Sequence, residues 1–310
     1  MDFNEFKEEL IEIIKGKTEE NTSVTVHTVN KNNGIILNGL VIMSEAETIS
    51  PTIYLEPFFE MAKKGKDMYA LADEILALSM EQKNKFNFDV DEFQDINVTG
   101  KKILYKLINY DKNGELLKNV PHRRWQDLAI VYYVLVSCDE LGTGTILIRN
   151  EHLKLWNVGE QELFTFATEN APRLLKKTIK TMAEIILDFM DEKLMDSDEN
   201  EITVKAAKEF GENTPIKMYV MGNKVKLNGA CVILYDRALA SFAEYVDSDF
   251  YILPSSIHEV ILVPINEDVD EHALLSLVRE VNENSVTEEE WLSDNIYKYN
   301  RSEETLEMIS

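Results

Sequence analysis

The order of strand-like and helix-like segments is the feature of this sequence that most constrains its fold. Residues 24–29 alternate between apolar and polar side chains, Asn32-Asn33-Gly34 supplies turn chemistry, and residues 35–43 continue as a second apolar strand. This pattern predicts a β-hairpin. Ahead of it, apolar residues recur at helical spacing from Phe3 to Ile14, which predicts a helix ending near Gly16.

Along the rest of the chain, strands and helices come in groups rather than in strict alternation. Strands are predicted at Ile53–Leu55, Lys102–Asn109, Trp125–Cys138, Thr145–Arg149, Ile216–Met221, Gly229–Tyr235, Phe250–Leu253 and Ile257–Val263. Helices are predicted from about Pro57, at Met68–Gln82, from Gly159 to about Lys193 with an interruption near Pro172, at Arg237–Tyr245 and at Asp270–Asn282. The grouping predicts an α+β fold with mixed or antiparallel sheets and helices packed on one face. The most apolar strands predict a core that includes Trp125, Ile130, Val134, Val232, Leu234, Ile261 and Val263.

The length of 310 residues favours two domains, because a single core rarely grows that large. Asp196-Ser197-Asp198-Glu199-Asn200-Glu201 is the best candidate for a boundary. We therefore predict an N-terminal α+β domain at 1–195, an acidic connection at 196–213 and a C-terminal α+β domain at 214–310.

The net charge of −24 is the most unusual bulk property of the chain. Affinity for nucleic acid and for anionic membranes comes from neutralising phosphates, so we expect no direct binding to either. The charge is uneven: residues 101–180 hold 13 Lys/Arg against nine Asp/Glu, whereas residues 265–310 hold three against 13. Either the acids only keep the protein soluble, or they form a surface that docks on a basic protein.

The N-terminal residues, the missing membrane span and the cysteines favour a cytoplasmic protein. The first ten residues carry acids where a secretory signal carries bases, and no stretch has the ~18 apolar residues of a membrane span. Cys138 and Cys231 lie far apart in apolar surroundings, which excludes a disulfide framework and a cysteine zinc site.

Motifs for metal and cofactor chemistry are missing. Asp196-x-Asp198-x-Asn200 has calcium-loop spacing, but the sixth position is Glu201 instead of glycine and the twelfth is Ala207. His258-Glu259 begins like a zinc-protease motif, but Leu262 occupies the position of the second histidine. We predict no metal site and no cofactor.

One polar focus lies between two apolar strands, at Ser255, Ser256, His258 and Glu259. A serine, a histidine and a carboxylate can act as nucleophile, base and orienting group. Neighbouring strand residues point to opposite faces, however, so a strand-connecting turn explains the same residues. An enzyme site could also be assembled from dispersed residues, with Asn109, Arg124 and Asp236 joining His258.

A second polar focus is Arg123-Arg124 beside Trp125, which could grip a carboxylate or phosphate. Lys176 and Lys177, on a predicted helix, could extend this candidate anion-binding surface. Salt bridges to the acidic majority of the chain are the alternative.

Several blocks of sequence resemble domain of unknown function family 5688, which consists of uncharacterised proteins of anaerobic Firmicutes. They are Ile53-Tyr54-Leu55-Glu56-Pro57, Leu107-Ile108-Asn109-Tyr110, Val120-Pro121-His122 and the segment Leu253–Pro264. The similarity covers roughly residues 35 to 305. A more distant likeness, at Ile148 to Trp156 and Asn170, is to the family of unknown function numbered 1444. These resemblances imply a bacterial cytoplasmic setting and no particular activity.

Two functions therefore compete. The missing catalytic motifs and the charge asymmetry favour a non-enzymatic binding or regulatory protein that acts through an acidic surface. The alternative is an enzyme whose site is assembled from dispersed polar residues. A deep pocket with convergent titratable groups would favour the enzyme.

We expect a chelator to leave the thermal stability unchanged, because the sequence offers no closely spaced set of metal ligands. Thermal unfolding followed by circular dichroism, with and without EDTA, measures this. A clear drop in Tm with EDTA would mean that residues distant in sequence assemble a metal site.

Overall fold

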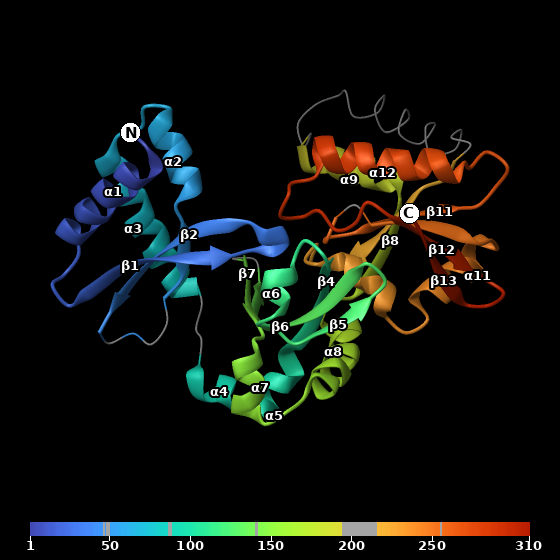
Figure 1. The fold of residues 1–310 in the computed structure, drawn as a ribbon, viewed down its shortest axis with the longest axis horizontal. Coiled ribbons are helices and arrows are strands. Elements are labelled where there is room, and N and C mark those ends of the chain that lie inside the picture. Colours follow the sequence, from blue (N-terminus) through green and yellow to red (C-terminus); the bar gives the residue numbers. More distant parts are fainter. Residues whose placement is uncertain (46, 48–49, 86–88, 140–141, 194–215, 255) are drawn as a thin grey trace. The chain divides into compact units, whose positions relative to one another are not determined.

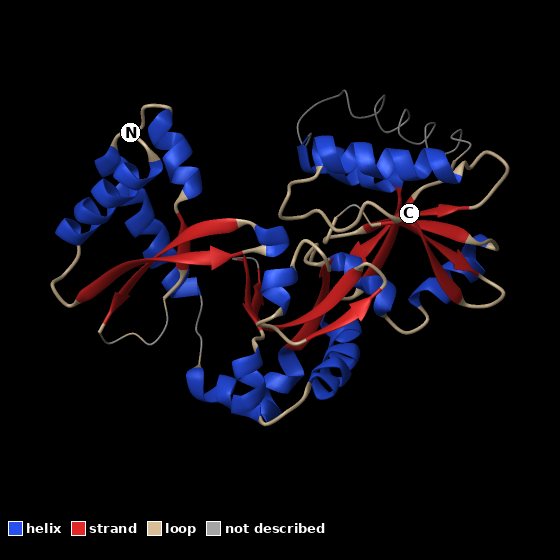
Figure 2. Ribbon diagram, viewed as in Figure 1, coloured by secondary structure: helices blue, strands red, loops and turns tan. Residues whose placement is uncertain are grey.

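The computed structural model of the chain contains two compact units, each built from strands and helices (Figure 1; Figure 2). The first unit comprises Met1–Thr99 and Val134–Ile146, and the second comprises Gly100–Tyr133 and Leu147–Ser310. The structure describes residues 1–45, 47, 50–85, 89–139, 142–193, 216–254 and 256–310.

The first unit packs helices on one face of a three-stranded antiparallel sheet. Up to Thr99 its elements are α1 (Phe3–Lys17), β1 (Thr22–Asn30), η1 (Asn32–Gly34), β2 (Ile36–Ser44), β3 (Thr52–Tyr54), α2 (Glu56–Lys63), α3 (Met68–Lys85), α4 (Val90–Gln94) and α5 (Ile96–Thr99). The Asp2 carboxylate caps α1 by accepting hydrogen bonds from the first-turn N–H groups. Phe6, Leu40 and Leu71 belong to the core between the helices and the sheet. The predicted first helix and hairpin are confirmed.

The elements after Thr99 form two further sheets. They are η2 (Gly100–Lys102), β4 (Ile103–Asn109), α6 (Gly114–Leu117), β5 (His122–Trp125), β6 (Leu128–Asp139), β7 (Gly142–Leu147), α7 (Asn150–Trp156), α8 (Glu160–Leu174), β8 (Lys177–Thr181), α9 (Met182–Lys193), β9 (Tyr219–Asn223), η3 (Gly229–Leu234), α11 (Ala238–Val246), β10 (Phe250–Leu253), β11 (Val260–Pro264), α12 (Glu271–Ser285), β12 (Ile296–Asn300) and β13 (Thr305–Ile309). One sheet has the order β4-β6-β5, with β7 paired to β6. The other is a six-stranded antiparallel sheet with the order β13-β12-β10-β11-β9-β8.

Helices cover both faces of the six-stranded sheet (Figure 1). Tyr251 of β10 packs in one cluster with Leu274 of α12. Its neighbour Phe250 contacts Phe242 of α11 edge-on, with ring centroids 4.9 Å apart. Since successive strand residues point to opposite faces, α11 and α12 lie on opposite sides of β10. The predicted α+β class is confirmed, while the expected one-sided helix packing describes the three-stranded sheet and not this one.

Two element predictions are wrong. The prediction from Gly159 to about Lys193 is right for α8 and α9 and wrong between them: α8 continues past Pro172 to Leu174, and Lys177–Thr181 form strand β8, which pairs with β9. The β-branched residues Thr178, Ile179 and Thr181 favour a strand once β9 offers hydrogen-bonding partners. The strand predicted at Gly229–Tyr235 is instead the 3₁₀ helix η3, because a short apolar run is equally compatible with a buried helix.

Three smaller outcomes complete the comparison. A turn at Gln126-Asp127 divides the predicted strand that begins at Trp125, so that Trp125 ends β5 and β6 begins at Leu128. The hairpin of β12 and β13 was not predicted at all. The predicted acidic connection at 196–213 lies outside the described residues, and the domain boundaries based on it stay predictions.

The predicted core residues lie inside. Ile130, Val134, Val232 and Val263 are at most 3% exposed. Trp125, Leu234 and Ile261 are half-buried. None of the seven is exposed, which agrees with the apolar pattern from which they were selected.

Leu262 on β11 is 0% exposed. We expect Leu262→Ala to lower the free energy of unfolding by about 2–5 kcal/mol, because a cavity replaces the buried methyl groups. Leu277 on α12 is 40% exposed and is the matched control, so Leu277→Ala should cost under about 1 kcal/mol. Urea unfolding measures both. Equal losses would contradict the burial of Leu262.

Candidate functional site

The polar turn before β11 uses its side chains to hold its own backbone. The Ser256 Oγ accepts a hydrogen bond of 3.0 Å from the backbone N–H of His258. The backbone N–H of Ile257 donates to the carbonyl oxygen of Glu290. Ser255 lies outside the described residues. Ser256 therefore acts here as a turn residue, which is what its position between two strands favours.

Both ring nitrogens of His258 have neighbours. The backbone N–H of Asn228 donates to Nδ1 at 3.3 Å, and Nε2 lies 3.5 Å from the Glu290 Oε1. In the neutral ring this arrangement leaves the proton on Nε2, facing a carboxylate. A histidine that serves as general base needs a free nitrogen aimed at a nucleophile, and His258 instead joins two loops.

Glu259, next along the chain, is a half-buried carboxyl group. Burial raises its pKa above the ordinary value, and the Glu290 carboxylate adds to the rise. Two glycines allow the backbone to pack closely around this turn. A Cβ on Gly229 would lie 2.2 Å from the His258 carbonyl oxygen, and one on Gly222 would lie 3.5 Å from the Glu259 Cβ.

The dispersed candidate residues Asn109, Arg124 and Asp236 lie in separate local environments. The Asn109 Nδ2 donates to the Leu292 carbonyl oxygen at 3.0 Å, and its Oδ1 accepts from the backbone N–H of Lys112. The Arg124 guanidinium lies 4.5 Å from the Tyr110 ring. Asp236 is exposed just before α11. Among the described residues, no hydrogen bond or ion pair joins any of these three to His258.

The candidate anion-binding residues are likewise separate. The Arg123 Nη2 donates to the Glu160 Oε2 at 2.9 Å and to the Gln161 Oε1 at 2.8 Å. The hydrogen bond to Glu160 raises the Arg123 pKa, so its charge already has a carboxylate partner. Lys176 and Lys177 are exposed, and Lys177 lies on β8 rather than on a helix. Within the described part of the chain, neither lysine bonds to the two arginines.

Sequence reasoning missed a network around Asp127, which occupies the β5–β6 turn. The Asp127 Oδ2 accepts hydrogen bonds from the Ser293 Oγ at 2.5 Å and from the Asn295 Nδ2 at 3.0 Å. The Asp127 Oδ1 accepts one from the Tyr297 hydroxyl. Burial, together with the Asp127 charge, raises the Tyr297 pKa far above its usual range. Both carboxylate oxygens are engaged, so this network is structural.

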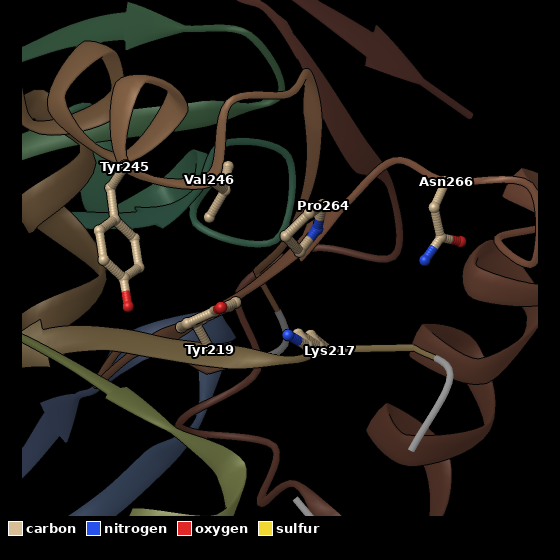
Figure 3. Close-up of a pocket in the computed structure, with 6 residues that line it drawn as sticks. All are labelled: Lys217, Tyr219, Tyr245, Val246, Pro264 and Asn266. Carbon is tan, nitrogen blue, oxygen red and sulfur yellow. The ribbon is translucent and has the colours of Figure 1, made fainter. Parts of the chain in front are cut away.

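Sequence reasoning also missed two adjoining pockets that share Tyr219 and Tyr245. The first, which we call the Lys217 pocket, has a volume of about 360 Å³ (Figure 3). It is lined by Lys217, Tyr219, Tyr245, Val246, Pro264 and Asn266. The second, the Glu184 pocket, has a volume of about 280 Å³. Besides the two tyrosines it includes Thr181, Glu184, Ser241 and Phe242.

The chemistry of these pockets is that of binding. Tyrosine rings, hydroxyl groups and an amide line them, with one lysine and one glutamate as charged groups. Burial raises the Tyr219 pKa, with smaller contributions from Tyr245 and Glu184, so its hydroxyl stays protonated as a hydrogen-bond donor. No sequence motif could have located the pockets, because their lining comes from β8, α9, β9, α11 and β11 and from the loop positions Lys217 and Asn266.

Two searches of the described residues bear on other functions. No three histidine, cysteine or acidic side chains among them come together as metal ligands. No helix within the same residues is long and apolar enough to cross a bilayer.

The comparisons with known proteins identify a family. A model described as a family of unknown function, DUF5688, matches residues 3–301, so the resemblance inferred from the sequence blocks is confirmed. The more distant likeness to the family numbered 1444 is not shown. Neither the curated proteins nor the solved structures yield a match.

The raised pKa of Glu259 predicts a pH-dependent effect of Glu259→Gln. For a carboxyl whose folded-state pKa is raised, stability is present below the unfolded pKa and is lost as pH rises through the folded pKa. Glu259→Gln should therefore be more stable than the parent at neutral pH, and the difference should vanish under acidic conditions where both states are protonated. Urea unfolding across pH measures this, with the exposed Glu280→Gln as control. A Glu259→Gln variant that is less stable at neutral pH would contradict the burial effect.

Proposed function

Because the chain belongs to the family of unknown function DUF5688, we propose its role from its own residues: it is a non-enzymatic binding protein that docks on a basic protein. The docking surface consists of the acidic side chains of residues 265–310, which we call the acidic segment. We propose that it acts in the bacterial cytoplasm.

One observation carries the proposal: the acids of the acidic segment stay at the surface. The segment holds 13 Asp and Glu against three Arg and Lys, a net charge of −10 (3 − 13). None of the 13 is buried, and nine are exposed. The nine exposed acids are Glu267, Asp268, Asp270, Glu280, Glu283, Glu288, Glu303, Glu304 and Glu307.

Two described arginines near this surface already pair with acids outside the segment. Arg301, one of the three in the segment, forms its ion pair with Asp247 outside it. Glu304 lies 3.8 Å from Arg237, which also pairs with Glu244. Exposed ion pairs of this kind are worth under about 1 kcal/mol, so a basic partner can replace them.

The local roles of the candidate catalytic residues support binding over catalysis. Asn109, His258 and Arg124 are engaged in loop contacts or ring stacking, as described above. In the Glu184 pocket the Thr181 hydroxyl donates to the Glu184 carboxylate at 2.9 Å, but the same carboxylate oxygen also accepts the backbone N–H of Thr181 at the start of α9, which is a helix-capping arrangement. A long-range electrostatic potential of one sign raises the rate of association with an oppositely charged protein.

The proposal predicts that binding depends on these particular charges. The quadruple variant Glu280→Gln, Glu283→Gln, Glu303→Gln and Glu307→Gln removes four exposed acids of the segment. Immobilised chain should retain a basic protein from a lysate of its own host at low salt and release it towards 1 M salt, where the Debye length falls from about 10 Å to about 3 Å. For the purified partner, the variant should lower the association rate constant by about tenfold in surface plasmon resonance.

The matched control removes four exposed acids from the first unit, as Glu8→Gln, Glu9→Gln, Glu12→Gln and Glu20→Gln. It changes the net charge equally and should leave the rate nearly unchanged. Equal effects of both variants would mean that only total charge matters. A partner whose binding ignores ionic strength would end the proposal and leave solubility as the role of the acids.

A further inference from the structure

Tyr219 and Tyr245 form a wall between the Lys217 pocket and the Glu184 pocket. Tyr219 begins β9 and Tyr245 lies near the end of α11. Their ring centroids are 6.2 Å apart with an interplanar angle of 88°. Figure 3 shows the Tyr245 ring directed from α11 towards Tyr219, beside Val246 and Pro264. A ligand that crosses this wall enters both pockets.

Tyr219 is packed within the fold, whereas Tyr245 is exposed. Tyr219 lies between Thr181 and Leu262 in the sheet register and packs edge-on against Phe242, 5.2 Å away. Tyr245 is 73% exposed. A rigid tyrosine offers contact area at small entropic cost, because it has only two side-chain torsions to fix.

Hydrogen-bond donors and acids surround the wall in a definite pattern. Neither tyrosine hydroxyl bonds to another group among the described residues, and the Lys217 amino group and the Asn266 amide line the same pocket. Glu184, exposed, lines the far pocket. Directly after Asn266 come Glu267 and Asp268, both exposed. Donors thus line the Lys217 pocket, one carboxylate lines the Glu184 pocket, and two exposed carboxylates follow Asn266 in the chain.

We propose that this double pocket binds an extended, proline-rich segment of the partner, with basic residues on either side of the prolines. A polyproline II helix has no internal hydrogen bonds, so its carbonyl oxygens need donors, which the tyrosine hydroxyls can supply. Its three residues per turn place prolines that are three positions apart on one face, and aromatic-lined grooves receive them. The flanking carboxylates match the basic residues.

The inference deepens the proposed function and rests on it for the charge of the partner. A single-stranded nucleic acid also stacks on aromatic rings, but its phosphates would be repelled by Glu184, Glu267 and Asp268. The peptide is therefore the occupant that the charges favour.

The test uses the full chain and two synthetic peptide pools. In the first pool, two prolines separated by two random residues are fixed between terminal arginines, and in the second, alanines replace the prolines. Immobilised chain should enrich the proline pool, and an enriched peptide should bind at least about tenfold more tightly than its alanine counterpart, by fluorescence anisotropy.

Tyrosine variants locate the site. Tyr245→Ala should weaken binding of the enriched peptide by about tenfold or more, as expected for an aromatic anchor. Tyr69→Ala, which removes a tyrosine that is 61% exposed in the first unit, is the matched control and should bind like the parent. Because Tyr245 is exposed, its loss should leave the folded state intact, as circular dichroism will verify.

The outcomes separate this inference from the proposed function. Equal retention of both pools, or equal binding by the parent and Tyr245→Ala, overturns the double-pocket site and leaves salt-dependent docking untouched. Enrichment of the proline pool that is lost in Tyr245→Ala but unaffected by salt supports the pocket and argues against the acidic docking surface. Tighter binding of a single-stranded oligonucleotide than of any peptide overturns both.

Discussion

The hydrogen bonds to Asp127 hold the loop between α12 and β12 in place, and much of the second unit depends on that loop. Ser293 and Tyr297, both 0% exposed, bond to this single carboxylate. The Asp127 carboxylate is half-buried, and its hydrogen bonds offset the cost of that burial, so docking of this loop stabilises the turn between β5 and β6. The loop in turn offers its carbonyl oxygens to Asn109 and to Ile257.

The same loop explains why polar residues gather without forming a catalytic site. Glu290 approaches His258 because its own carbonyl oxygen already accepts the Ile257 N–H. The histidine, its glutamate and Asn228 are therefore brought together by loop packing, and Glu259 is half-buried as a result. The tyrosine pockets differ, since the hydroxyl groups of Tyr219 and Tyr245 have no such partners among the described residues. This contrast is the main structural reason to look for binding at the pockets.

Local signals in the sequence predicted most elements and little of the site. The first helix and the β1–β2 hairpin carry their own caps and turn, so their patterns were sufficient. β8 was mistaken for a helix because its conformation depends on pairing with β9, and η3 because its packing against the His258 carbonyl is a tertiary contact. Tyr219 and Tyr245 meet only through the placement of α11 on the sheet, which no spacing along the chain reveals.

The strand order also has a consequence for how the protein is made. β10 lies in the middle of the six-stranded sheet, yet one of its two neighbours is β12, which the ribosome produces later. The hydrogen bond between Asp127 and Ser293 joins residues that are further apart, since Ser293 is synthesised 166 residues after Asp127. A nascent chain that has reached β11 therefore exposes the edge of β10 that β12 covers in the finished protein, and its Asp127 carboxylate still lacks Ser293, Asn295 and Tyr297 as partners. An unpaired strand edge of this kind is prone to aggregation until β12 has been made and has paired with β10.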